Sequence, residues 1–544
     1  MEAQVTKRQY VTVGIICFIN LINYMDRYTV AAILFDIQGS FGIGEAEGGL
    51  LQTAFIFAYM IMAPLFGWLG DRYNRKWLLS AGILFWSLST LLGSFMPDYV
   101  SFLVLRCVVG VGEASYTTIA PTIISDLFIG DKRSKMLAVF NFAIPVGAGL
   151  GYILGSLVLF IGGNGMTDDD RVANEVWRWG LRVTPWMGVI AVVMIIFLLD
   201  EPARGKCEGG QNIKTTSLLD DLKYLLKNEA FVLNTLGFTA VTFVMGALAW
   251  WAPNFISLGV DVQESSNVPK DYVSVIFGAE SMISGLIGVP LGAYLGRRLR
   301  VRYPKADPVV CGIGILIAAP LIILATFTAE QNTLLSILLC FFGLIFQNLN
   351  WSIVTDMMLY TVIPTRRATA SALLILVSHT LGDAGSPYLM GLMADGFARL
   401  IPEDNTTTTT TEIAVTLSST AASTESIIST TADPDGGDDN YVRFKSLQYA
   451  MAIVTSVDFI GTIFFVWLAF YIVKAKNRVD DIVKDSKDEN HLAEISGHVN
   501  AAYDSGTTEN TTVDQPEKMK NGINGSVNTS IPDESITGTE CQDE

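Results

Sequence analysis

The sequence predicts an all-α membrane protein with twelve transmembrane helices in two groups of six. Half of its 544 residues are hydrophobic, 16% are charged, and the mean hydropathy is +0.41. Runs of about 20 apolar residues, each able to cross a bilayer core of roughly 30 Å, recur from Tyr10 to Tyr471. The net charge of −17 comes largely from the C-terminal tail and from one set of loops, so it indicates no nucleic-acid partner.

The connections between the spans alternate in charge. The spans are centred near Ile22, Met60, Leu84, Gly110, Gly147, Ile190, Val244, Ser284, Ala318, Phe346, Val377 and Phe464. One set of connections carries basic clusters, as at Arg297 to Lys305, and the other carries acidic residues, as at Asp168 to Asp170. Because basic loops stay on the cytosolic side, we expect both termini to be cytosolic.

A long connection on the basic side, residues 201–229, divides the chain into an N-terminal bundle (1–200) and a C-terminal bundle (230–475). Within it, Leu218 to Asn228 has the pattern of a short amphipathic helix that lies at the membrane surface.

Two polar segments flank the last span. Residues 401–440, on the non-cytosolic side, are rich in threonine and serine and carry the sequon Asn405-Thr406-Thr407, which predicts glycosylation at Asn405. The tail, residues 476–544, is polar and acidic, which predicts disorder.

Span four places Arg106 and Glu113 inside an apolar run. Positions seven apart lie two turns apart on one helix face, so both charges point the same way. Charges in hydrocarbon are costly, and we expect this face to look into the bundle or a wet cavity. The pair either takes part in transport or forms a structural ion pair that locks two helices.

The loop Gly67-Trp68-Leu69-Gly70-Asp71-Arg72-Tyr73-Asn74-Arg75-Lys76 resembles the signature between the second and third helices of the Major Facilitator Superfamily. The resemblance implies a gating role, which we assign to Gly67, Asp71, Arg72, Arg75 and Lys76. Asn74 stands where that family usually has glycine, and asparagine tolerates the left-handed backbone that glycine would adopt.

Three further stretches resemble the Spinster family of that superfamily: Asn23 to Val30, Arg106 to Glu113, and Ser378 to Tyr388. The similarity runs from span one to span twelve. It implies the major facilitator fold and an alternating-access, proton-dependent carrier of lysophospholipids or sphingolipids, either for lysophospholipid efflux from lysosomes or for export of a lipid such as sphingosine-1-phosphate. We therefore expect a lipid substrate, protons as coupling ion, no other cofactor, and a monomer in the lysosomal or late endosomal membrane, with the plasma membrane as alternative.

Polar residues in span one suggest where a head group binds. Asn20, Asn23 and Arg27 fall within about 60° of one another on the helix, and the guanidinium of Arg27 suits a phosphate. Arg27 can equally pair with Asp26 or Glu113 to stabilise the bundle. We assign the head group to Arg27, Asn23, Asn20 and Glu280, an isolated acid in span eight.

Proton coupling is assigned to Glu113, with Asp26 as second candidate and Arg106 as counter-charge. A carboxylate whose arginine neighbours change during alternating access changes its proton affinity, and a permanent Glu113–Arg106 pair would remove this coupling. In span eleven His379 and Asp383 are four residues apart and can hydrogen-bond, so they either sense pH or only join helices.

Aromatic residues are the candidate lining for a lipid chain, although aromatics in a membrane bundle also serve packing. The candidates are Phe142, Trp250, Trp251, Phe346 and Trp351.

The sequence leaves functions other than lipid transport open. The two arginines would also suit a small organic anion, and a protein of this fold could be a sensor that does not transport. The six cysteines form no disulfide or metal pattern, and three histidines without a nucleophile motif indicate neither an enzyme nor a metal site.

Overall fold

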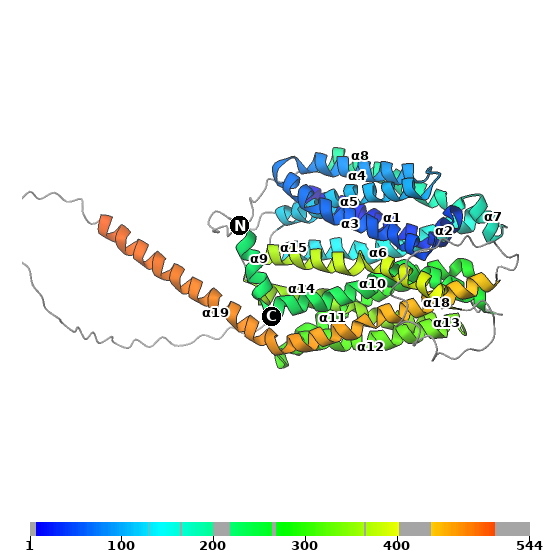
Figure 1. Ribbon diagram of the computed structural model, residues 1–544. Coiled ribbons are helices and arrows are strands. Elements are labelled where there is room, and N and C mark those ends of the chain that lie inside the picture. Colours follow the sequence, from blue (N-terminus) through cyan, green and yellow to red (C-terminus); the bar gives the residue numbers. More distant parts are fainter. Residues whose placement is uncertain are drawn as a thin grey trace, which may run out of the picture. The chain divides into compact units, whose positions relative to one another are not determined.

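The computed structural model describes residues 7–128, 130–163, 166–199, 218–263, 268–363, 366–401 and 437–505, which form helices and no strand. Asn405 and the tail beyond Ser505 lie outside the described residues. Residues up to Val483 form one compact unit, and Lys484 onward a second unit. The N-terminal helices lie together, and the C-terminal helices form the other half of the bundle (Figure 1).

The N-terminal half holds six spans and three short elements. They are α1 (Lys7–Ala32), α2 (Leu34–Phe41), α3 (Glu45–Arg72), α4 (Arg75–Gly93), α5 (Tyr99–Leu127), α6 (Gly130–Gly162), α7 (Asp168–Ala173), η1 (Val176–Trp179) and α8 (Gly180–Leu198).

The C-terminal half follows the linker helix α9 (Leu218–Lys227). Its elements are α10 (Glu229–Val262), η2 (Lys270–Tyr272), α11 (Val273–Arg302), α12 (Ala306–Thr328), α13 (Thr333–Asn348), α14 (Asn350–Thr361), α15 (Arg367–Ser378), η4 (His379–Asp383), α16 (Ser386–Ala398), α18 (Gly437–Thr455) and α19 (Val457–Ser505).

Ten segments of the described chain are long and apolar enough to cross a membrane. The two other predicted spans are α1 and the segment α15–η4–α16. Both segments carry the polar residues that the sequence predicted to be functional. The second segment is also broken into short pieces by the π-helical turn η4. Both nevertheless pack among the other helices, because their polar side chains face protein rather than lipid.

Glycines let α1 and α6 approach closely. A Cβ atom at Gly147 would lie 2.6 Å from the carbonyl oxygen of Leu21, and one at Gly151 would lie 2.5 Å from that of Met25. These spacings, four residues apart on one face, are the small-residue contact by which membrane helices pack.

The predicted linker helix is present as α9. Asp221 makes an ion pair of 2.7 Å with Arg366, whose guanidinium lies over the ring of Tyr224, while Leu225 is fully buried. The amphipathic face of α9 therefore packs on the start of the eleventh span.

The last helix, α19, continues beyond the predicted boundary at residue 475 and ends at Ser505, inside the stretch expected to be disordered. Residues 476–505 are rich in Lys, Asp and Glu at spacings of three and four, which support a solvated helix.

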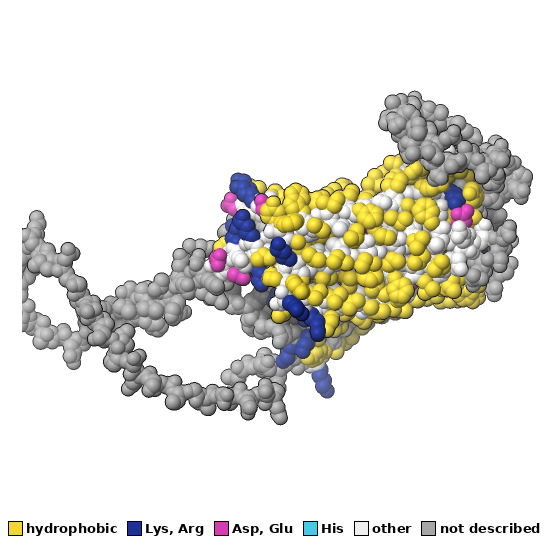
Figure 2. Space-filling view, turned by 90° about the horizontal axis from the view of Figure 1, so that it is seen from below, with side chains coloured by type: hydrophobic (Ala, Val, Ile, Leu, Met, Phe, Trp, Pro, Cys, Tyr) yellow, Lys and Arg dark blue, Asp and Glu magenta, His cyan; other side chains and the backbone are white. Residues whose placement is uncertain are grey.

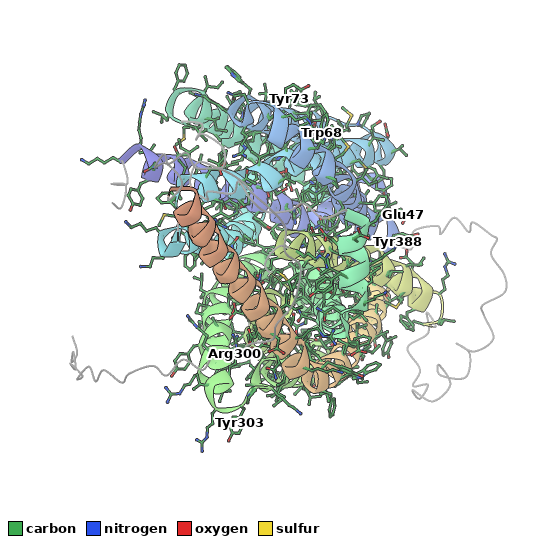
Figure 3. The ribbon with its side chains drawn as sticks, turned by 90° about the vertical axis from the view of Figure 1, so that its left-hand side faces the viewer. Glu47, Trp68, Tyr73, Arg300, Tyr303 and Tyr388 are labelled. Carbon is green, nitrogen blue, oxygen red and sulfur yellow. The ribbon has the colours of Figure 1, made fainter. Side chains whose placement is uncertain are left out.

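Lysine and arginine side chains gather at one end of the apolar surface, which we call the basic end (Figure 2). Figure 3 views the molecule from this end, with Trp68 and Tyr73 on the N-terminal half and Arg300 and Tyr303 on the C-terminal half. The opposite end is the far end. By the positive-inside rule we infer that the basic end is cytosolic.

Candidate functional site

A buried ion pair joins α1 to α5. Arg27 Nη2 donates to Glu113 Oε2 at 2.9 Å; Glu113 is fully buried and Arg27 is 9% exposed. Glu113 Oε1 accepts no hydrogen bond from the described residues. The carboxylate thus keeps one oxygen available to a proton or to a donor on a ligand.

The ring of Phe55, on α3, lies close to two guanidinium groups. The Cζ atoms of Arg27 and Arg106 each lie 4.9 Å from its centroid. Cation–π contacts stabilise a positive charge without using its N–H donors. Arg106 is buried, and its Nε and Nη2 have no hydrogen-bond partner among the described residues. The permanent Glu113–Arg106 pair, which the sequence left open as an alternative, is therefore not formed, and Arg106 keeps donors for an anion.

Asp26 points to the other side of α1. It accepts hydrogen bonds from Trp86 Nε1 at 3.1 Å and Thr90 Oγ1 at 3.3 Å, both on α4, and from Thr184 Oγ1 on α8. Through these three hydrogen bonds, Asp26 holds α1, α4 and α8 together in this conformation. Its negative charge also acts on Arg106.

The two asparagines of α1 have different surroundings. Asn20 Nδ2 donates to the carbonyl oxygen of Phe140 on α6 at 2.8 Å. Asn23 is fully buried, and neither its Nδ2 nor its Oδ1 has a partner among the described residues. Of the two, Asn23 keeps groups that can bind a ligand.

His379 and Asp383 form the predicted pair inside η4. His379 Nδ1 lies 2.8 Å from Asp383 Oδ1, and both side chains are partly exposed. The charges of Asp383 and Arg27 both act on Tyr28 and Tyr59 of the N-terminal half. The pair in span eleven and the ion pair between α1 and α5 therefore border the same central region.

Glu280 lies apart from the other predicted head-group residues. It is buried on α11, where its carboxyl group lies beside the thiol of Cys340 of α13. The structure does not bring it together with Arg27.

The aromatic candidates are spread over several environments. Trp250 and Trp251 are buried. Trp250 donates to the carbonyl oxygen of Gly48 in the N-terminal half at 3.1 Å, and Trp251 donates to that of Pro387 within the C-terminal half at 2.9 Å. Phe346 is partly buried, and Trp351 packs against Phe238. Phe142 is 54% exposed on α6.

The gating loop is held at the basic end. Arg75 makes an ion pair with Asp126 and donates to the carbonyl oxygen of Gly70, and Arg72 lies over the ring of Trp68 at 4.2 Å. Lys76 lies in the first turn of α4, while the side chain of Asp71 lies outside the described part of the structure. Asn74 does not adopt a left-handed backbone: its φ is −62°, and its side chain accepts from the backbone N–H of Trp77 at 3.2 Å, because it caps α4.

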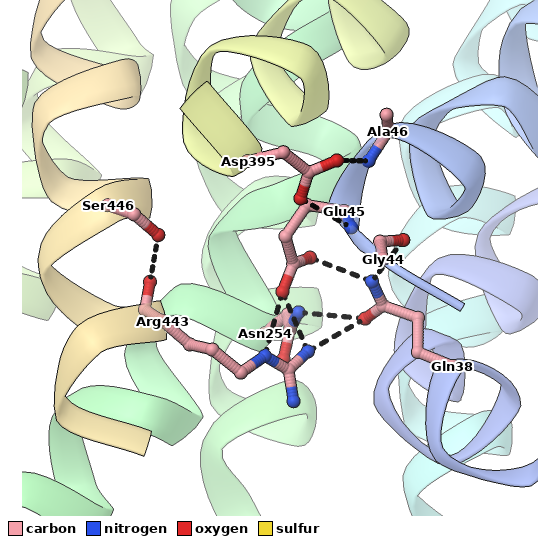
Figure 4. A network of polar contacts seen from close by, with 8 residues as sticks. All are labelled: Gln38, Gly44, Glu45, Ala46, Asn254, Asp395, Arg443 and Ser446. Atoms are coloured by element: carbon pink, nitrogen blue, oxygen red, sulfur yellow. Dashed lines mark hydrogen bonds and ion pairs between the residues drawn. The ribbon is translucent and has the colours of Figure 1, made fainter. Parts of the chain in front are cut away.

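A polar network between the halves at the far end was not predicted (Figure 4). Arg443 of α18 makes an ion pair of 2.7 Å with Glu45 of α3, and Gln38 Nε2 donates to the other oxygen of Glu45 at 2.7 Å. Asp395 of α16 accepts from the backbone N–H groups of Glu45 and Ala46. Charged residues near span ends were the available signal, but their partners depend on how the halves meet.

The same face of α3 is packed at the far end and open at the basic end. Gly49 and Gly67 are five turns apart and share a face. A Cβ atom at Gly49 would lie 2.2 Å from the carbonyl oxygen of Pro387, whereas one at Gly67 would meet no described atom within 4 Å. α3 therefore packs tightly against the C-terminal half at the far end, and at the basic end the position of Gly67 has no described atom against it.

Two helical halves that pack together at one end around buried charges are the architecture of a membrane transporter. The profile of the Major Facilitator Superfamily matches residues 16–387.

The chain is 45% identical to protein spinster of Drosophila melanogaster over 91% of this chain and 82% of that one. It is 49% identical to protein spinster homolog 1 of Mus musculus over 72% of this chain and 74% of that one. The crystal structure of a bacterial homolog to the human lysosomal transporter Spinster, in an inward-facing and unoccupied conformation, shares its fold with a TM-score of 0.70 and 20% identity, covering 86% of this chain and 98% of that one. The chain belongs to the spinster family of major facilitator transporters.

Proposed function

We propose that this transporter carries single-chain, phosphate-bearing lipids, namely lysophospholipids or sphingolipids, and that protons drive it. The main observation in support of this proposal is the group of Arg27, Glu113 and Arg106. In it a buried ion pair lies beside a second buried guanidinium with free donors. A phosphate can accept from Arg106 and compete with Glu113 for Arg27. Glu113 then takes up a proton when it loses its partner.

An apolar route for the lipid chain is supported by Phe142. On α6 this residue shares a face with Pro145 and Gly149, which pack against Gly285 and Gly278 of α11. Phe142 lies closer to the basic end of that face and is 54% exposed. We infer that α6 and α11 part there, so that a chain can reach the bundle from the inner leaflet.

Location and modification are part of the proposal. A lysosomal or late endosomal membrane is supported by the name of the human protein to which the bacterial homolog is compared, with the plasma membrane as alternative. Asn405 stays the predicted glycosylation site.

Uptake into proteoliposomes tests the proposal. Labelled lysophosphatidylcholine and sphingosine-1-phosphate are offered with and without an inward proton gradient to the unmodified chain, Glu113→Gln and Arg106→Gln. We expect the proton gradient to stimulate flux in the unmodified chain and not in Glu113→Gln. Arg106→Gln should reduce the flux at least about tenfold, which corresponds to a loss of ~1.4 kcal/mol in binding. Glu175→Gln, at an ion pair within the N-terminal half, is the control.

Transport of neither lipid by folded protein would overturn the lipid proposal and favour a small organic anion. An equal gradient response in Glu113→Gln would overturn its role in coupling.

A further inference from the structure

An apolar groove runs between α12 and α19 on the outside of the C-terminal half. It has a volume of about 230 Å³. Val309, Ile313 and Leu316 line one wall, and Val466 and Phe470 line the other; all five are at least 40% exposed. Gly312 forms the floor, because its missing side chain leaves space between the two rows.

The groove has the depth of one leaflet. From Lys305, at its basic end, to Leu316 it follows 11 residues of α12, which is about 17 Å at 1.5 Å per residue. The hydrocarbon core of a bilayer is roughly 30 Å thick. An acyl chain lying in the groove would therefore belong to a lipid of the leaflet at the basic end.

A positive charge without an acidic partner marks the mouth of the groove. Lys305 is exposed, its Nζ lies 5.6 Å from the ring centroid of Phe470, and it forms no ion pair within the described residues. The nearby Asp307 is fully buried and is held by Arg300 at 2.6 Å and Tyr360 at 2.7 Å, so it does not neutralise Lys305.

A second lysine extends the charge on the other wall. Lys474 follows Val466 and Phe470 at a spacing of four residues, which places it on the same face of α19. It is exposed and likewise forms no ion pair within the described part of the chain. The two lysines thus flank the point where the groove reaches the membrane surface.

We propose that this groove binds one acyl chain of an anionic phospholipid from the cytosolic leaflet, with the phosphate between Lys305 and Lys474. The charge complementarity and the one-leaflet depth select this occupant. The site lies on the lipid-facing surface of α12 and α19, away from Arg27 and Glu113, and does not depend on what the protein transports.

Native mass spectrometry of the purified full chain tests the site. Phosphatidylglycerol and phosphatidylcholine with identical acyl chains are titrated separately, and their dissociation constants are compared. Each lysine near a membrane surface is expected to strengthen binding of an anionic lipid about fivefold. Lys305→Gln and Lys474→Gln should each weaken phosphatidylglycerol binding by about this factor and leave phosphatidylcholine binding unchanged. Lys223→Gln, at an exposed position on α9, is the matched control.

A second pair of variants tests the groove itself. Gly312→Leu fills the floor and should weaken both lipids, whereas Gly312→Ala places its Cβ 3.5 Å from Phe465 Cβ, an ordinary contact, and should keep the fold. Equal affinity for the two lipids, or no change in the lysine variants, would overturn the proposal. If the unmodified chain retains no lipid but forms dimers, and Gly312→Leu abolishes these dimers, the groove would instead be assigned to a second copy of the chain.

Discussion

Asp26 and Arg27 are neighbours in the sequence, but their side chains serve opposite sides of α1. Asp26 is saturated by donors from α4 and α8, whereas Arg27 pairs with a carboxylate that keeps a free oxygen. A saturated carboxylate has little to gain from a ligand, while a half-satisfied pair can exchange partners. Under the proposed proton coupling, this contrast favours Glu113 over Asp26 as the coupling carboxylate.

The Arg27–Glu113 pair is expected to show strong coupling in stability. Glu113→Gln leaves Arg27 buried without its counter-charge, which costs about 3–5 kcal/mol when a buried pair loses one partner. Arg27→Met combined with Glu113→Gln removes both charges and should recover most of this loss. The unfolding midpoints of the unmodified chain, the single variant and the double variant in detergent give the comparison. Equal midpoints for the single and the double variant would contradict the prediction.

Which residues carry charge in the bundle could be predicted from the sequence, because charged side chains in apolar runs are conspicuous. Arg27, Arg106, Glu113, His379 and Asp383 were found in this way. The partners of these residues were harder to predict, because an ion pair between α1 and α5 depends on the rotation of each helix in the packed bundle.

Phe55 and Arg443 were missed for the same reason. Phe55 is one of many aromatics in an apolar helix, and only its position between two guanidinium groups distinguishes it. Arg443 gains its role from Glu45, which lies 398 residues earlier in the chain.

At the scale of single elements, the start of α5 depends on one carboxylate. Asp98 caps the helix by accepting from the backbone N–H of Ser101 at 2.7 Å and from its hydroxyl at 3.0 Å. These hydrogen bonds hold the pKa of Asp98 below its usual range. Because the folded pKa is lowered, the stabilisation is complete above the unfolded pKa, about 4, and is lost as the pH falls through the folded pKa.

Asp98→Asn keeps an acceptor at the cap but removes the charge. The unmodified chain should therefore unfold at a higher temperature than Asp98→Asn at pH 7, and this difference should shrink as the pH is lowered to about 3. Thermal unfolding of both proteins across this range measures it. A difference that does not change with pH would show that the charge at the cap has no effect.

The contact of α3 with α16 gives a second prediction at this scale. Gly49→Ala brings a methyl group against the carbonyl oxygen of Pro387, a backbone atom that cannot rotate away, so the far end should open more often. Gly67→Ala, on the same face of α3, meets no described atom and should leave the present conformation unchanged. Labelling of a cysteine placed at the far end by a membrane-impermeant thiol reagent reports opening. Equal labelling rates in the Gly49→Ala and Gly67→Ala variants would contradict the prediction that Gly49→Ala opens the far end.

The whole molecule is held in this conformation by contacts at the far end. The network of Glu45, Arg443, Gln38 and Asp395 joins α3 to α16 and α18, and Trp250 of α10 donates across the same junction to the carbonyl oxygen of Gly48. The two halves and the basic end followed from hydropathy and charge, and ten of the twelve predicted spans are long and apolar enough to cross a membrane. Which end is closed did not follow from hydropathy and charge, since both conformations of a carrier share one sequence.

Loss of the Glu45–Arg443 pair is expected to shift the balance between these conformations. Each carrier state is favoured by the contacts present only in it, and a change of 1.4 kcal/mol shifts the ratio about tenfold. The pair is partly buried, with 6% side-chain exposure for Glu45 and 24% for Arg443. Arg443→Gln leaves the buried Glu45 without its counter-charge, so it should change the free-energy difference between the two states by more than this value. The fraction of molecules open at the far end should then rise at least about tenfold.

Spin labels at the far end can measure this fraction. With the native cysteines replaced, labels at Val100 of α5 and Leu334 of α13, both more than half exposed, report the distance between the halves. Arg443→Gln should add a longer distance to the distribution. Glu175→Gln breaks an ion pair of 2.6 Å with Arg178 at the same end but within one half, and it should leave the distribution unchanged. If both variants lengthen the distance alike, the effect comes from general loosening; if neither does, the aromatic and backbone contacts hold the far end closed without the ion pair.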